Sequence, residues 1–175
     1  MAFHLAGYIG ASPTPRPDFL SRSVPDPLLT VSGCLADGLI LPEYGWYDGP
    51  ADVPGDDIVA LGLAPKDAAE LLAEFADELD PTELLARQQA LPTGSKRLGF
   101  EVIGVETWGD VHSWHCHNYL PMVDSVLDVR VNELGLIPSY DMANRLLEWM
   151  LELPPEEEPE PVHWTIVALA TVPNG

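Results

Sequence analysis

The pattern of apolar residues predicts short strands and helices separated by turn-forming residues. Residues 3–9, 97–108 and 162–172 are mostly apolar with β-branched side chains, which is typical of strands, and we expect the last two to lie side by side. Residues 65–79 repeat apolar side chains at the spacing of one helix face, and residues 139–153 do the same. A sheet and at least two helices are therefore expected.

Two further helices are expected in the middle of the chain. Residues 80–90 begin with an Asp-Pro pair, which suits the N-cap and first turn of a helix. Residues 112–131 predict another helix with a bend near Pro121, and Ser139 is a good N-cap for the last helix. The predicted fold is α+β, with a small antiparallel sheet, three to four helices packed on it and a proline-rich irregular N-terminal segment.

The irregular segment is predicted over residues 11–60, because proline lacks the backbone donor and fixes φ. A brief strand at 38–41 is its one regular feature, and residues 61–175 form the α+β core of what we expect to be a single domain. Tyr44, Trp46 and Tyr47 lie on a loop of this segment. They either anchor a partner protein or fold back as a lid over the core, and the lid is the interpretation that we prefer.

The net charge limits the classes of partner. The chain of 175 residues has 28 acidic and 8 basic residues, a formal net charge of −20. This charge repels nucleic-acid phosphate and anionic lipid and attracts basic proteins, so we expect a protein partner with a basic surface and neither nucleic acid nor membrane. No apolar run reaches the roughly 18 residues of a transmembrane helix, and no secretory signal pattern is present. We therefore expect a cytoplasmic protein.

Acidic residues of the helix predicted at 65–79 are the first candidate binding surface. Asp67, Glu70, Glu74 and Glu78 fall on one face of this helix, beside its apolar stripe. The ordinary interpretation is a solvated helix face, and the alternative is a docking site for a basic partner. The candidate face comprises Asp67, Glu70, Glu74, Asp77 and Glu78.

A cluster of histidines is the second candidate site. His112, His115, Cys116 and His117 are residue types that bind zinc. The sequence lacks an HExxH or paired CxxC motif, so we prefer a structural role for these residues and keep a metal site as an alternative. No GxSxG, P-loop or GxGxxG motif indicates catalysis, and neither a cofactor nor enzymatic activity is expected.

Two motifs resemble a group of small uncharacterised bacterial proteins. These proteins combine a strand of the form G-Y/F-E-V-x-G with a turn of the form H-S-W-x-C-N, which residues 98–106 and 112–117 resemble. The likeness covers about residues 97–172, and His117 stands where the pattern has asparagine. The resemblance implies an immunity protein or an accessory binding protein of a bacterial toxin system, with the two motifs as determinants of the fold.

Three hypotheses follow from the sequence. The first is an acidic protein-binding module, with an immunity protein that covers the basic or active-site surface of a toxin as its most specific form. The second is a metal-binding protein or metal-dependent enzyme that uses the histidine cluster. The third is a subunit of a larger protein assembly.

Overall fold

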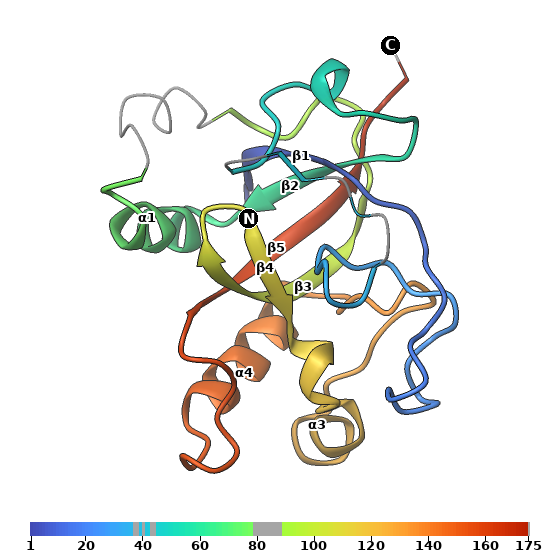
Figure 1. The fold of residues 1–175 in the computed structure, drawn as a ribbon, viewed down its shortest axis with the longest axis vertical. Coiled ribbons are helices and arrows are strands. Elements are labelled where there is room, and N and C mark those ends of the chain that lie inside the picture. Colours follow the sequence, from blue (N-terminus) through green and yellow to red (C-terminus); the bar gives the residue numbers. More distant parts are fainter. Residues whose placement is uncertain (37–38, 40, 43–44, 79–88, 175) are drawn as a thin grey trace.

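The fold is α+β, with one five-stranded antiparallel sheet (Figure 1). The computed structural model describes residues 1–175 except 37–38, 40, 43–44, 79–88 and 175. The strands lie in the order β1-β2-β5-β3-β4. Their bounds are β1 (His4–Gly10), β2 (Ile58–Leu63), β3 (Arg97–Thr107), β4 (Asp110–Ser113) and β5 (His163–Thr171). The α-helices of the described residues are α1 (Pro65–Glu74), α3 (Leu120–Leu127) and α4 (Tyr140–Leu151).

The central strands are covered on both faces. Phe100 and Val102 of β3 belong to a core shared with α3 and α4. Ile103 and Val105 belong to a second core on the opposite face, which α1 and parts of the segment before β2 complete. Burial of both faces explains why β3 and β5 appear in the sequence as nearly continuous apolar runs.

The strands predicted at both ends and in the middle of the chain are confirmed as β1, β3 and β5. β3 and β5 are neighbours, with Phe100 opposite Ala168 and Val102 opposite Ile166. Ser139 caps α4 as predicted, because its hydroxyl accepts a hydrogen bond from the backbone N–H of Met142. These elements combine a strong hydrophobic pattern with a clear cap or turn signal.

β2 was not predicted. Residues Ile58–Leu63 pair with both β1 and β5, so the boundary expected at residue 60 falls inside this strand. All six residues are apolar or glycine and five of them are buried, so they show neither the alternation of a half-buried strand nor the length of a helix. The expected strand at 38–41 is not confirmed. Leu39 and Leu41 are irregular, and positions 38 and 40 lie outside the described residues.

The predicted helix at 112–131 is wrong at its start. The chain first forms β4, which pairs with β3 across a tight turn at Gly109, and then a short 3-10 helix, η2 (Trp114–His117). Ser113 accepts a hydrogen bond from the N–H of His115, and Asn118 ends η2 in a left-handed conformation. The α-helix itself begins only at Leu120, with Pro121 in its first turn, and it ends at Leu127, before the predicted end.

The helix predicted at 65–79 is shorter than expected. α1 ends at Glu74, and Phe75 begins a turn in which its carbonyl accepts from the N–H of Glu78. Almost all of the helix predicted at 80–90 lies outside the described residues, and Ala90 forms an isolated bridge with His4.

Glu101 fixes the segment between β1 and β2 to the sheet. Its side chain is 1% exposed and lies in the middle of β3. Its carboxylate accepts hydrogen bonds from the hydroxyls of Thr30 and Ser113, both at 2.6 Å, and from the backbone N–H of Val31 at 2.9 Å. A buried carboxylate is tolerated when its oxygens are satisfied in this way.

Candidate functional site

The acidic residues predicted on α1 do not all lie on one surface. Glu70, Glu74, Asp77 and Glu78 are exposed, the last two on the turn after the helix. Asp67 is a correction, because it is only 2% exposed and accepts a hydrogen bond of 2.7 Å from the hydroxyl of Tyr140 on α4. Burial raises the pKa of Asp67. This carboxylate fixes α1 against α4 and does not belong to a surface available to a partner.

One open hollow collects carboxylates from three separate parts of the chain. Glu74 comes from the last turn of α1, Glu106 from the end of β3, and Glu160 from the segment before β5. We call this site the acidic hollow. Its lining residues are Glu74, Val105, Glu106, His112, Glu160, Pro161, Val162 and His163. These lining residues include three carboxylates and no lysine or arginine.

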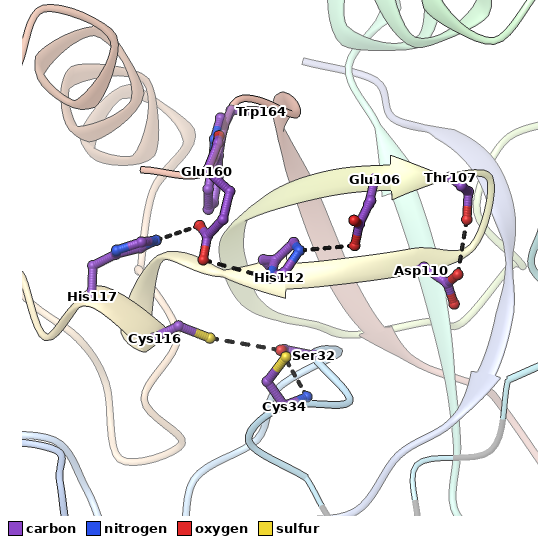
Figure 2. A network of polar contacts seen from close by, with 10 residues as sticks. All are labelled: Ser32, Cys34, Glu106, Thr107, Asp110, His112, Cys116, His117, Glu160 and Trp164. Carbon is purple, nitrogen blue, oxygen red and sulfur yellow. Dashed lines mark hydrogen bonds and ion pairs between the residues drawn. The ribbon is translucent and has the colours of Figure 1, made fainter. Parts of the chain in front are cut away.

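Two histidines hold Glu160 in the acidic hollow (Figure 2). His117 Nε2 lies 2.6 Å from Glu160 Oε2, and His112 Nδ1 lies 3.8 Å from Glu160 Oε1. The other ring nitrogen of His112 lies 3.2 Å from Glu106 Oε2. The indole N–H of Trp164 donates to the backbone carbonyl of Glu160 at 2.9 Å and fixes its main chain. Glu106 and Glu160 are therefore held in place before any partner binds.

The electrostatic environment keeps Glu160 ionised. Partial burial would raise its pKa, but a hydrogen bond from its own backbone N–H and the hydrogen bond and charge of His117 outweigh that effect, with a further contribution from His112. The pKa of Glu160 is therefore below its usual range. Glu106 is the more open of the two carboxylates, with its side chain 61% exposed against 38% for Glu160. Fixed carboxylates that are open to solvent can accept hydrogen bonds from a cationic group.

The histidine cluster is divided between the surface and the core. His112 lines the acidic hollow and His117 contacts its Glu160, whereas His115 is buried and donates from Nε2 to the carbonyl of Gly135 at 2.9 Å. Burial lowers the pKa of His115 to about 4, so its ring is neutral. Cys116 points toward Ser32, away from the hollow (Figure 2).

The four candidate metal ligands therefore do not converge. Within the part of the chain that the structure describes, no group of three or more His, Cys, Asp or Glu residues is arranged to hold a metal ion. The side chains of His112 and His117 instead contact carboxylates, and that of His115 contacts the backbone.

The aromatic loop does not supply three exposed anchors. Trp46 is only 3% exposed and packs against Trp108, with ring centroids 4.7 Å apart. Tyr47 is partly buried, and its backbone pairs with that of Tyr8 in β1. Tyr44 lies outside the described residues. Trp46 is therefore part of the core and not a surface anchor.

Sequence reasoning missed the role of Glu160. This residue lies in an acid- and proline-rich stretch that resembles a solvated linker, and no local pattern indicates its contact with His117. Glu106 and His112 lie six positions apart on two strands joined by a tight turn. Recognition of this hairpin would have indicated their proximity.

Comparison with protein-family models, with curated proteins and with solved structures finds no match for this chain. In the described residues, no helix has the length and apolar character needed to cross a membrane. The functional proposal therefore depends on the side chains of the acidic hollow and its surroundings.

Proposed function

We propose that this chain is an acidic protein-binding module and that its acidic hollow receives basic side chains of a partner protein. The observation that carries the proposal is the convergence of Glu74, Glu106 and Glu160 from three distant parts of the sequence on one open hollow. The lining residues include no lysine or arginine that would neutralise these carboxylates. Histidines contact two of these carboxylates, Glu106 and Glu160, but the three carboxylates outnumber the two histidines, so negative charge remains available to a cation from outside.

The charge of the whole chain supports the same proposal. A formal net charge of −20 attracts a basic protein over a distance and increases the rate of association, and salt screens this effect. At short range, an arginine guanidinium fits a carboxylate with two parallel hydrogen bonds. Such charged hydrogen bonds contribute about 1.5–3 kcal/mol each when water is excluded from them.

The exposed residues around the hollow extend the proposed surface. Glu78 lies next to the hairpin that carries Glu106, because its carboxylate accepts a hydrogen bond from the backbone N–H of Trp108 at 3.3 Å. Glu70 is exposed on α1, one turn before Glu74. An immunity protein, as the sequence resemblance implies, is one form of this proposal, since a toxin with a basic active site would be blocked by such a surface.

The proposal is tested by titrating the ¹⁵N-labelled chain with an arginine-containing peptide, Gly-Arg-Gly-Arg-Gly, and following the amide chemical shifts. The hollow variant combines Glu74→Gln, Glu106→Gln and Glu160→Gln. The control variant combines Asp18→Asn, Asp124→Asn and Glu133→Gln, which are exposed residues outside the hollow lining, so both variants remove three negative charges.

In the unmodified chain, we expect the largest amide shifts at residues 105–106, 112, 160 and 162–163. The hollow variant should bind the peptide about tenfold more weakly, a difference of about 1.4 kcal/mol, and the control variant should change little. Equal weakening in both variants, with shifts spread over the whole chain, would show that only the net charge matters and would refute the acidic hollow as the binding site.

A further inference from the structure

The two cysteines of the chain are far apart in sequence but lie at the same hydroxyl group. Cys116 Sγ is 3.9 Å from the hydroxyl oxygen of Ser32, and the backbone N–H of Cys34 donates to that oxygen at 3.3 Å. Figure 2 shows the Cys116 side chain pointing toward Ser32, with the Cys34 side chain beside it. Both cysteines are free thiols in this structure.

The surroundings of the two thiols differ in a way that gives them different chemical roles. Cys34 is exposed, so a small oxidant in solution can reach it, whereas Cys116 is partly buried. Burial raises the pKa of Cys116, and the nearby charges of Cys34 and Glu101 make smaller contributions in the same direction.

The first part of the turn that carries Cys34 is open to solvent, because Gly33 and Cys34 are exposed. Gly33 precedes it, and a side chain at that position would meet no atom within 4 Å. Ser32, which separates the two cysteines, is itself fixed to the buried Thr30 through its backbone N–H. Leu35 and Ala36 are buried and their backbone N–H groups donate to the carbonyl of Ser32, so the movement that brings the Cys34 sulfur toward Cys116 must be confined to Gly33 and Cys34.

We propose that Cys34 and Cys116 form an oxidisable pair that hydrogen peroxide converts to an intramolecular disulfide. The Cys34 thiolate attacks the peroxide, an S–O bond forms as the O–O bond breaks, and the products are a Cys34 sulfenic acid and one molecule of water. The Cys116 sulfur then attacks the Cys34 sulfur and loses its proton, the S–O bond breaks and a second water leaves. The two thiols lose two electrons in total, and the peroxide is reduced to two waters.

The disulfide would connect the segment between β1 and β2 to η2, directly after the strand that carries His112. A bridge between residues so far apart in sequence restricts the unfolded chain strongly. We expect the oxidised protein to unfold at a temperature about 5–10 °C higher than the reduced protein.

The test exposes the whole folded chain to stoichiometric hydrogen peroxide and follows thiol content, intact mass, peptide linkage and thermal unfolding. We expect both thiols to disappear, the monomer to lose two hydrogen atoms in mass, and peptide mapping to join the peptides of Cys34 and Cys116. The rate of bridge formation should not depend on protein concentration. The Cys34→Ser and Cys116→Ser variants should each lack the bridge and the rise in unfolding temperature.

Three results would overturn the proposal. These are disulfide-linked dimers in place of the bridged monomer, oxygen added to one cysteine while the other thiol stays free, and a bridge that forms only after denaturation. Because Cys34 is exposed, the Cys34→Ser variant is expected to fold, and its far-ultraviolet circular dichroism provides the check.

Discussion

Replacing Glu101 by alanine should release the segment around Thr30 from the sheet. In the native structure, one oxygen of Glu101 accepts from the hydroxyls of Thr30 and Ser113 and the other accepts from the N–H of Val31. The two hydroxyls are themselves oriented, because each accepts a hydrogen bond from a backbone N–H two residues later. Alanine would therefore leave three buried donors pointing at an empty space.

The size of the effect follows from these contacts. A buried donor without its acceptor costs about 1–3 kcal/mol. The full sum for three donors overestimates the loss of stability, because the native carboxylate also carries a cost. Burial raises the pKa of Glu101. The shift shows that desolvation of the carboxylate offsets part of the free energy that its three hydrogen bonds contribute. We expect Glu101→Ala to lower the free energy of unfolding by about 3–5 kcal/mol, because three neutral donors lose their acceptor while the cost of burying the carboxylate is removed.

Glu101→Gln is the matched control, because glutamine keeps the shape of the side chain. Its amide oxygen can accept from the N–H of Val31, while its NH₂ group can donate to the hydroxyl oxygens of Thr30 and Ser113. We expect this variant to lose only about 1–2 kcal/mol. Both free energies are measured by urea denaturation, and hydrogen exchange of the amides at 30–36 locates the change. A loss below about 1 kcal/mol for alanine, or equal losses for both variants, would refute the reasoning.

Two other predictions concern buried ionisable groups. The pKa of His115 is about 4 in the folded protein and about 6.5 in the unfolded chain, so the unfolded chain binds more protons between these values and stability rises with pH there. The free energy of unfolding of the unmodified chain should fall by roughly 3 kcal/mol as the pH is lowered from above 6.5 to 4. In urea denaturation, the His115→Gln variant should not show this decrease. Tyr140→Phe leaves Asp67 buried without its hydroxyl donor and should cost about 1–3 kcal/mol at pH 7. The cost should be smaller at acidic pH, because burial raises the pKa of Asp67 and the protonated form needs the donor less, whereas a cost independent of pH would contradict this explanation.

The sequence predicts those elements whose local pattern and tertiary surroundings agree. β3 and β5 are long, apolar and β-branched, and they occupy the middle of the sheet. β2 is equally buried but short, and it follows a proline-rich stretch, so periodicity cannot distinguish it from an irregular segment. β4 has only four residues, and its pairing with β3 depends on a glycine at φ +109° in the turn, a local signal that outweighs the helical spacing of the histidines.

The candidate site was less predictable than the fold. Glu74 was recognised as acidic and helical, and it does line the acidic hollow. Asp67 has the same helical spacing, yet it is buried and bonded to the hydroxyl of Tyr140, and only the tertiary structure distinguishes the two positions. Glu160 contacts His117 across a long stretch of chain, so its role depends on packing that a single sequence does not show.

The acidic hollow and the core beneath it share one set of aromatic contacts. Phe75, directly after α1, packs against Trp108 in the β3–β4 turn and against His163 at the start of β5, with ring centroids 6.2 and 6.4 Å apart. These residues join the three parts of the chain that supply Glu74, Glu106 and Glu160. The carboxylates themselves are exposed or partly exposed and contribute little to packing. Changes at the carboxylates should therefore alter binding without unfolding the protein, whereas changes at the aromatic contacts should alter both, because the geometry of the hollow is a consequence of the core.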